Sequence, residues 1–392
     1  MNTESSRRNF LAAGLALPVA GLASTTASPT PPAPAPQQAG GPAGKISYRV
    51  LGKTGMKVTT VGYGCMITSD PSVISRAVDM GINYFDTSRG YQNGQNERMV
   101  GAALGAKRKD VFVSSKADGP WTGASILAQL DTSLKELNTD HLDVWLLHGL
   151  GSGAQITDEL VEAQRKAKQQ GKVRFIGMST HNLPAVADRV IEAKLEIVQA
   201  QYNFTSAAEW GPAIDKLNQA GVGLVAMKVM AARGGGGRGR GGAQAAAPAA
   251  PPTGRMTAAL KWVIKNPVIA TTVPSMTDID QLEQNFAVMG QIFTDADQKV
   301  LTATLKEIRP YFCSMCGQCE GQCPKGLPAR DLVRFVMYAD GYGQFPLGRE
   351  NFQRLSAEHQ AIRCADCSSC AIKCPYGVRV AAMAMRAQEL FA

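Results

Sequence analysis

The sequence predicts an α/β fold, a (β/α)8 TIM barrel followed by a small, cysteine-rich and helical domain, and two observations support this prediction. Between residues 46 and 289, eight short β-rich segments alternate with amphipathic helical segments. Near the C-terminus, eight of the nine cysteines stand in two identical runs. Parallel strands need helical crossovers, and eight such strands are the number that closes a barrel.

The expected barrel elements follow in chain order. Residues 46–58 are expected to form a hairpin around Gly52 and Gly55 that plugs the floor of the barrel. The eight strands are expected at residues 60–66, 84–88, 111–116, 142–148, 174–180, 197–203, 223–229 and 270–276. Helices are expected at residues 72–80, 97–104, 123–137, 158–170, 207–220 and 294–308, and several of them are followed by a glycine.

The first 27 residues have the organisation of an export signal. Arg7 and Arg8 precede Phe10 and Leu11, an apolar stretch follows to Leu22, and small residues continue to position 27. This pattern resembles the twin-arginine signal, so the twin-arginine export machinery is an expected partner, and a periplasmic or other extracytoplasmic location is expected. An uncleaved anchor behind a chance arginine pair is the alternative. Residues 28–44, rich in Pro, Ala and Gly, are expected to be a flexible linker.

One connection departs from the barrel pattern. Residues 233–254, after the seventh strand, are rich in Gly, Ala and Pro and too poor in apolar side chains to fold alone. They follow a strand end, on the face where barrel enzymes build their sites. Two interpretations of this segment remain: a loop that closes over phosphates, or a disordered segment. The barrel is expected to span residues 45–309 with this insertion, and the second domain residues 310–392.

The two cysteine runs both read C-x2-C-x2-C-x3-C-P, a spacing typical of [4Fe–4S] ligands. Neither run has the paired knuckles of a zinc site, and a disulfide framework would not repeat one ligand spacing. Two [4Fe–4S] clusters, and hence electron transfer, are therefore expected. In the usual two-cluster arrangement one cluster takes Cys313, Cys316, Cys319 and Cys374, and the other takes Cys364, Cys367, Cys370 and Cys323.

The segment between the cysteine runs and the charge of the chain narrow the possibilities further. Residues 331–339 and 352–362 have helical periodicity, so a helical cluster domain is expected. The formal net charge is +9, but no basic helix with interleaved aromatic residues is present in the sequence. Nucleic acid is therefore not an expected partner.

Four polar residues follow consecutive strands of the predicted barrel. Asp86, Lys116 and His148 stand at the ends of the second, third and fourth strands, and Tyr91 follows Asp86 in the next loop. Such positions converge on the catalytic mouth of a barrel.

These four side chains suit the reduction of a carbonyl or the oxidation of an alcohol. Tyr91 could exchange the proton, Lys116 could lower its pKa, and Asp86 could orient Lys116. His148 could donate a hydrogen bond to the substrate oxygen. The plainer interpretation is that Asp86 and Lys116 form a structural ion pair, that Tyr91 is an aromatic residue at the rim of the barrel, and that His148 is a hydrogen-bonded polar residue at a strand end.

At this point the chain resembles the aldo-keto reductase family, over about residues 46–293. The resemblance rests on Phe85-Asp86-Thr87-Ser88 with Tyr91, Ser114-Ser115-Lys116, Leu146-Leu147-His148 and Glu283-Gln284-Asn285. It implies a barrel of that family's type, a catalytic tetrad of the four residues above, and a bound nicotinamide cofactor.

The resemblance also implies that the cofactor is NAD or NADP and that a particular set of residues contacts it. Gly64, Cys65 and Met66 would line the cofactor, Ser179 and Gln199 would contact the carboxamide, Lys228 would lie by the pyrophosphate, and Asn285 would reach the adenine. Ser275 and Gln281 stand where members that grip the NADP phosphate have Lys and Arg. Losing two cationic donors weakens the binding of a phosphate dianion, so NADH is somewhat favoured.

Two functional hypotheses follow. The first is an exported iron–sulfur oxidoreductase that acts with a nicotinamide on a small carbonyl or alcohol. The second is a non-catalytic electron-transfer subunit whose barrel is a docking scaffold for a redox partner protein. A nicotinamide transfers a two-electron hydride, whereas each cluster carries one electron, and this mismatch keeps the second hypothesis open.

Overall fold

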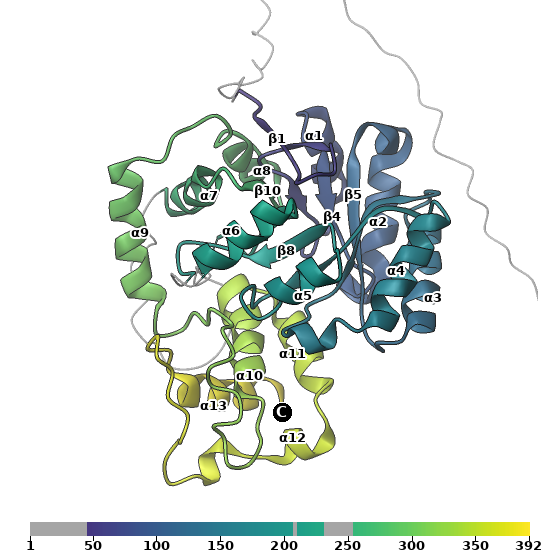
Figure 1. Ribbon diagram of the computed structural model, residues 1–392. Coiled ribbons are helices and arrows are strands. Elements are labelled where there is room, and N and C mark those ends of the chain that lie inside the picture. Colours follow the sequence, from purple (N-terminus) through teal and green to yellow (C-terminus); the bar gives the residue numbers. More distant parts are fainter. Residues whose placement is uncertain (1–44, 207–209, 231–253) are drawn as a thin grey trace, which may run out of the picture. The chain divides into compact units, whose positions relative to one another are not determined.

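The computed structural model describes residues 45–206, 210–230 and 254–392 (Figure 1). The expected signal at residues 1–27, the linker at 28–44 and nearly all of the insertion at 233–254 lie outside the described residues. Among the helices that the structure describes, none combines the length and hydrophobicity needed to cross a bilayer.

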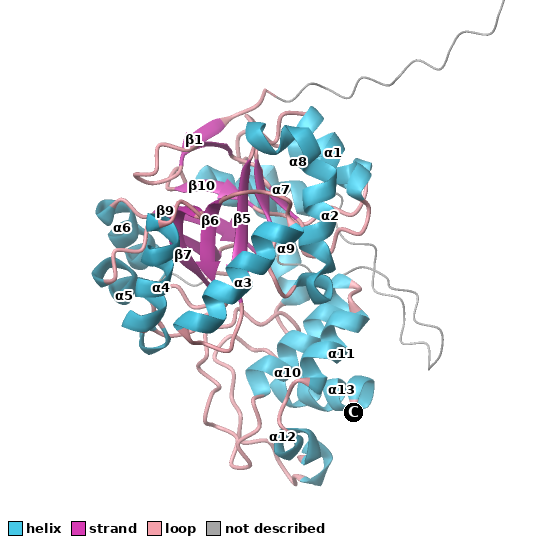
Figure 2. Cartoon of the chain, turned by 90° about the vertical axis from the view of Figure 1, so that its right-hand side faces the viewer, coloured by secondary structure: helices cyan, strands magenta, loops and turns pink. Residues whose placement is uncertain are grey.

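Eight parallel strands form a nearly closed barrel, as predicted. Their order in the sheet is β10-β9-β8-β7-β6-β5-β4-β3, and parallel bridges from Val61 to Thr272 and from Gly64 to Ser275 join the first and last strands. Helices surround the strands (Figure 2). The strands are β3 (Tyr63–Gly64), β4 (Tyr84–Asp86), β5 (Phe112–Ala117), β6 (Leu142–Leu147), β7 (Val173–Thr180), β8 (Ile197–Gln201), β9 (Gly223–Met227) and β10 (Ile269–Thr272).

The helices that cover the barrel include all six that the sequence predicts. They are α1 (Pro71–Asp79), α2 (Gln95–Leu104), α3 (Gly123–Glu136), α4 (Asp158–Gln169), α5 (Ala187–Glu192), α6 (Trp210–Ala220), α7 (Arg255–Lys265), α8 (Ile279–Phe286) and α9 (Asp295–Ile308). The structure adds α5, α7 and α8. Side chains of Asp70, Thr122 and Asp278 accept hydrogen bonds from backbone N–H groups at the starts of α1, α3 and α8, which fixes where these helices begin.

A hairpin lies against the starts of the barrel strands. It consists of β1 (Tyr48–Val50) and β2 (Lys57–Thr59). The Arg49 guanidinium donates to the carbonyls of Ile264, Asn266 and Ile269 at 2.6 to 2.7 Å, which ties the hairpin to the start of β10. The Lys53 N–H donates to the Gly221 carbonyl at 3.0 Å, just before β9. The predicted plug of the barrel floor is therefore confirmed.

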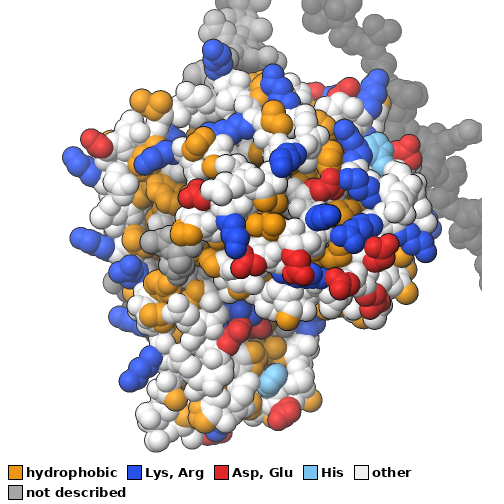
Figure 3. Space-filling model, viewed as in Figure 1, with side chains coloured by type: hydrophobic (Ala, Val, Ile, Leu, Met, Phe, Trp, Pro, Cys, Tyr) orange, Lys and Arg blue, Asp and Glu red, His pale blue; other side chains and the backbone are white. Residues whose placement is uncertain are grey.

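The barrel has two apolar layers. Inside it, buried side chains of the strands meet those of the hairpin, among them Leu51, Met56, Tyr84 and Val144. Outside it, a larger core packs the strands against the surrounding helices. On the face seen in Figure 3, acidic and basic side chains are intermixed over the barrel.

The C-terminal region is helical, as expected. It contains α10 (Ala329–Val336), a π-helical turn η4 (Met337–Gly341), α11 (Phe345–Gln353), α12 (Ala357–Ala361), a short η5 (Cys364–Asp366) and α13 (Val380–Phe391). Helices α10, α11 and α13 share a separate apolar core that includes Leu332, Val336, Phe352, Ala387 and Phe391. The first cysteine run lies in the loop before α10, and the second begins in η5 and continues in the loop before α13.

One close approach between strands provides a test of the barrel. A Cβ added at Gly177 of β7 would lie 2.0 Å from the Ile197 carbonyl oxygen of β8, so backbone atoms would have to move. We expect Gly177→Ala to lower the free energy of unfolding by at least about 2 kcal/mol, as overpacking does. Chemical denaturation of the purified protein measures this loss.

Gly151→Ala is the matched control. Its Cβ would meet only the Gln155 side-chain oxygen, at an ordinary 3.8 Å, so its effect should stay within about 0.5 kcal/mol. Equal stabilities of the two variants would contradict the described register of β7 and β8.

Candidate active site

A buried ion pair occupies the mouth of the barrel. The Lys116 ammonium at the end of β5 donates to the two Asp86 carboxylate oxygens at 2.8 and 2.7 Å and to the Thr87 carbonyl at 2.7 Å. Lys116 is 0% exposed and Asp86 3%. The same ammonium lies 3.3 Å from the Tyr91 hydroxyl. Three of the four predicted catalytic residues therefore share one set of contacts.

Tyr91 is held in a short loop helix, η1 (Tyr91–Gly94). The next two residues, Gln92 and Asn93, have positive φ values of 51° and 53°, an uncommon conformation that tends to occur at functional sites. The Gln92 amide fixes the loop by donating to the Thr68 carbonyl at 2.7 Å. The loop thereby orients the Tyr91 hydroxyl toward the Lys116 ammonium.

The pKa of Tyr91 differs from the expectation. Burial of the hydroxyl and the negative charge of Asp86 together raise the pKa of Tyr91 well above its ordinary value. The net shift is therefore opposite to the one expected from the charge of Lys116 alone, because burial and the charge of Asp86 both oppose ionisation of the phenol. Tyr91 keeps its proton at neutral pH, which suits a general acid.

His148, the fourth predicted residue, follows β6 and has a partner that the sequence did not reveal. Its Nδ1 lies 2.5 Å from the Asp118 carboxylate and 3.2 Å from the Ser88 hydroxyl. Its ring meets the Tyr91 ring edge-on, with centroids 5.7 Å apart. Asp118 therefore favours a proton on Nδ1 and orients the imidazole toward Tyr91.

Asp118 itself is ionised. Burial would raise the pKa of Asp118, but the hydrogen bond and charge of His148 outweigh burial and lower it. The signal that could have found Asp118 is its place directly after the β5 strand end.

A second ion pair supports the Tyr91 loop. Buried Glu97 of α2 pairs with Arg89 and accepts a hydrogen bond from the Ser115 hydroxyl at 2.5 Å. Arg89 also donates to the Gly94 carbonyl at 2.8 Å. These contacts connect α2, β5 and the Tyr91 loop.

A cavity of about 610 Å³ opens beside the tetrad, within the size range of small-molecule sites. Asp86 and Tyr91 line it, together with five of the eight residues predicted to bind the cofactor: Gly64, Met66, Gln199, Lys228 and Ser275.

Three predicted cofactor residues do not line the cavity. Cys65 is 0% exposed and packs in the core behind the wall. The Ser179 hydroxyl accepts a hydrogen bond from the Gly149 N–H at 2.8 Å, and Asn285 of α8 is 6% exposed.

Gln199 provides a test of whether the cavity suits a nicotinamide. Its side-chain N–H donates to Asp86 at 3.0 Å. Its carbonyl oxygen is buried and has no hydrogen-bond partner among the described residues. Buried acceptors are normally paired, so this oxygen is placed for an incoming N–H donor such as a carboxamide. The residues present therefore fit the group that the resemblance implies.

The loop of the first cysteine run lies on the barrel mouth. The Gln201 amide, at the end of β8, donates to the Ser314 carbonyl at 3.0 Å, and the Asn182 amide donates to the Cys316 carbonyl at 3.5 Å. Gln201 is in turn paired with His181 Nδ1 at 2.9 Å. Burial lowers the pKa of His181 well below its ordinary value, so this ring is neutral.

Two groups of cysteine thiols influence one another's charge. Burial raises the pKa of Cys313 to about 12, and the neighbouring Cys319, Cys316 and Cys374 add to this rise. Burial likewise raises the pKa of Cys364, with contributions from Cys323, Cys367 and Cys370. Each set takes three thiols from one run and the fourth from the other, which is the grouping that two [4Fe–4S] clusters need.

The spacing within the sets also bears on the kind of metal. No three or more His, Cys, Asp or Glu side chains of the described residues converge closely enough to hold a single metal ion. In a four-iron cube each cysteine binds a different iron, so its sulfurs are spread more widely than the four ligands of one zinc ion. The described thiols therefore do not form a single-ion site.

Comparisons with known proteins agree with both halves of the chain. The model of the aldo/keto reductase family matches residues 69–245, and that of the 4Fe-4S dicluster domain matches residues 312–378. An uncharacterised oxidoreductase of Bacillus subtilis is 30% identical over 186 residues, 43% of this chain and 60% of that protein. L-galactose dehydrogenase of Arabidopsis thaliana is 28% identical over 304 residues, 68% of this chain and 95% of that protein.

Solved structures extend the comparison to the fold. An aldo-keto reductase from Bacillus halodurans in its holo form has a TM-score of 0.56 at 24% identity, over 66% of this chain and 96% of that one. An aldo-keto reductase from Klebsiella pneumoniae in complex with NADPH has a TM-score of 0.54 at 22% identity, over 66% and 95%. The barrel fold is therefore shared with these structures, while residues 69–245 match the aldo/keto reductase family and residues 312–378 the 4Fe-4S dicluster domain.

Proposed function

We propose that the protein is an exported iron–sulfur oxidoreductase that reduces the carbonyl of a small molecule, or oxidises the corresponding alcohol, with a nicotinamide cofactor. The observation that carries this proposal is the Lys116 ammonium, which lies within 3.3 Å of the Tyr91 hydroxyl and is paired with Asp86 at the wall of the cavity. A bound nicotinamide supplies or accepts the hydride.

Tyr91 is the general acid and base of this proposal. Its raised pKa keeps the hydroxyl protonated, so the proton is available for the alkoxide that develops during reduction. Lys116 then stabilises the phenolate left behind, while Asp86 keeps the ammonium in place. In the oxidation direction the phenolate takes the proton back from the alcohol. His148, which Asp118 orients, donates a hydrogen bond that positions the substrate oxygen.

The cofactor is NAD or NADP, with NADH somewhat favoured. Gln199 offers a free acceptor to the carboxamide, and Lys228 and Arg255 bring positive charge to the cavity wall. Ser275 and Gln281, which also line the cavity, are neutral and lend no charge to an additional phosphate. The Klebsiella pneumoniae relative was solved with NADPH, so both forms belong in any binding assay.

The two thiol sets hold two [4Fe–4S] clusters that exchange single electrons with a redox partner protein. The contacts of Gln201 and Asn182 with the first cysteine loop support a route between these clusters and the barrel mouth. Cys367 and Cys370 are exposed, which suits electron exchange at the surface.

Replacing Tyr91 by Phe tests the catalytic proposal. The variant loses only the hydroxyl, so we expect reduction of a panel of small aldehydes and sugars to slow by about 10²–10⁴-fold, the usual share of general acid–base catalysis. Nicotinamide binding, measured by equilibrium titration, should remain. Tyr48→Phe, on the exposed β1 strand at the barrel floor, is the control and should keep full turnover. Full turnover by Tyr91→Phe would refute the proposed role.

Paired cysteine substitutions test the two thiol sets. Cys323→Ser with Cys364→Ser removes two thiols from one set, so about half of the iron should remain, with one cluster intact. Cys323→Ser with Cys374→Ser removes one thiol from each set, and both clusters should be disturbed. Iron analysis and electron paramagnetic resonance of the reduced proteins distinguish the two. The grouping is wrong if both variants disturb both clusters.

Export is tested at the arginine pair. Twin-arginine recognition depends on both guanidinium groups, so Arg7→Lys with Arg8→Lys should leave the protein in the cytoplasmic fraction. Arg238→Lys with Arg240→Lys makes the same chemical change elsewhere and should leave export intact. Periplasmic recovery of the first variant at the wild-type level would rule out this route.

A further inference from the structure

The C-terminal domain forms one wall of the catalytic cavity. Five consecutive residues, Asp340, Gly341, Tyr342, Gly343 and Gln344, line the same cavity as Asp86, Tyr91 and Gln199 of the barrel. We name residues 340–344 the lid turn. A ligand beside the tetrad therefore contacts both domains.

The lid turn has an unusual backbone. It begins within the π-helical turn η4, a conformation often found at functional sites. Gly343 has φ = 67°, which favours glycine, and the Gln344 N–H donates to the Tyr338 carbonyl at 2.7 Å. This backbone directs the turn back toward the barrel, with Tyr342 at its centre.

A cation–aromatic contact fastens the lid turn to the barrel. The Lys228 ammonium, just after β9, lies 5.2 Å from the centroid of the Tyr338 ring and 5.6 Å from that of Tyr342. Both distances are within the range of cation–π attraction. Lys228 itself has a positive φ of 56°, so its backbone adopts an uncommon conformation in reaching this position.

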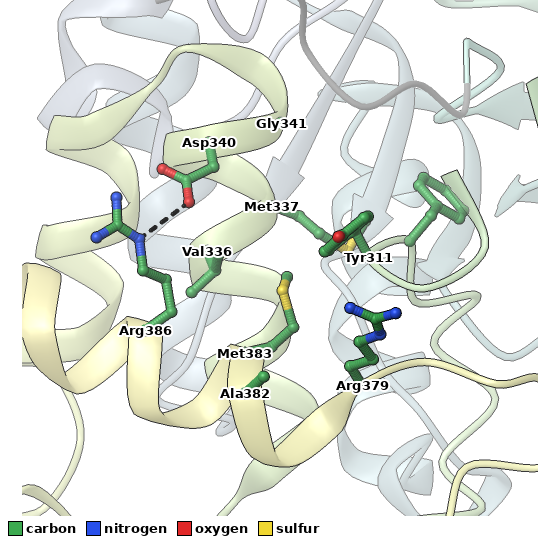
Figure 4. A pocket seen from close by; sticks show the side chains of 10 residues that line it. Tyr311, Val336, Met337, Asp340, Gly341, Arg379, Ala382, Met383 and Arg386 are labelled. Atoms are coloured by element: carbon green, nitrogen blue, oxygen red, sulfur yellow. Dashed lines mark hydrogen bonds and ion pairs between the residues drawn. The ribbon is translucent and has the colours of Figure 1, made fainter. Parts of the chain in front are cut away.

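A second, smaller cavity of about 210 Å³ lies behind the lid turn (Figure 4). Asp340 and Gly341 line both cavities, so the turn is a partition between them. Arg386 of α13 pairs with Asp340 at 3.3 Å and holds the partition from behind. The rest of this second cavity is largely apolar, with Val336 and Met383 in its wall. The turn can therefore withdraw into this space once the Arg386 contact is released.

The charges of the main cavity indicate an anionic ligand. Among the described residues, Lys228 brings a positive charge to its wall beside Tyr338 and Tyr342. The described carboxylates that line it are paired, Asp86 with Lys116 and Asp340 with Arg386. The ammonium of Lys228 and the unpaired amide oxygen of Gln199 on one cavity wall suit a molecule that carries a phosphate and a carboxamide, as a nicotinamide dinucleotide does.

We propose that the lid turn, supplied by the cluster domain, closes over a nicotinamide dinucleotide and retains it as a resident group. This inference rests on the proposed function and adds to it that the cofactor does not exchange with each turnover. Departure of the dinucleotide requires Tyr342 to leave Lys228 and the turn to move toward the second cavity. Retention matters for an exported enzyme, since nicotinamides are not expected to circulate freely outside the cytoplasm.

Chase experiments test the lid turn without turnover. Protein with both clusters is loaded with radiolabelled NAD⁺ or NADP⁺, mixed with an excess of the unlabelled compound, and filtered at intervals. Wild type should keep its label through gel filtration. Tyr342→Ala should release it about tenfold faster, because the cation–aromatic contact of the lid turn is lost while that of Tyr338 remains. Arg386→Met should also release it faster, and Tyr342→Phe should stay within about twofold of wild type.

Controls separate the lid from folding and from catalysis. Tyr48→Ala removes an exposed tyrosine at the barrel floor and should retain the label like wild type, and visible absorbance verifies the clusters of each variant. Release from Tyr342→Ala at the wild-type rate, or loss of label from wild type during gel filtration, overturns the lid. If neither dinucleotide binds wild type, the proposed function fails with it. If the lid variants release faster but Tyr91→Phe turns over normally, only the proposed catalytic role fails.

Discussion

The buried pair of Lys116 and Asp86 is the interaction on which the rest of the site depends. Removing one partner of such a pair leaves an uncompensated buried charge, at a cost of about 3–5 kcal/mol. The pair connects β4 with β5, and Asp86 also accepts from Gln199 of β8. It therefore fixes the strand ends around the cavity. Together with burial, which contributes most, the charge of Asp86 also raises the pKa of Tyr91 and so favours the protonated hydroxyl.

The sequence predicts the frame of this site better than its details. Strand ends can be read from β-rich segments, so Asp86, Lys116 and His148 could be assigned to one mouth before any coordinates. Asp118 is not predicted, because the expected strand ends at residue 116 and only the structure extends β5 to Ala117, the residue before Asp118. The direction of the Tyr91 pKa shift is not predicted either, because a sequence contains opposite charges but not the burial that opposes ionisation.

The contribution of the C-terminal domain was hidden for a different reason. Lys228 and Tyr342 are more than a hundred positions apart in the sequence, and neither position has a motif that indicates the other. The cysteine spacing predicts the thiol sets, since ligand spacing within a run is local. It does not indicate that the first cysteine loop rests on Gln201 and Asn182. The sequence therefore predicts the ligands within each cysteine run, whereas it does not predict how one domain docks on the other.

This docking bears on how the proposed two-electron site would be joined to one-electron carriers. The chain has two thiol sets, so two clusters together would carry as many electrons as one hydride. Met337, the first residue of η4, accepts a hydrogen bond from the Cys313 N–H at 3.3 Å through its sulfur. Met337 therefore connects the backbone of Cys313 to η4, whose last residues Asp340 and Gly341 line the main cavity. A cluster held by Cys313 would thus be linked to the lid turn through one short helical turn.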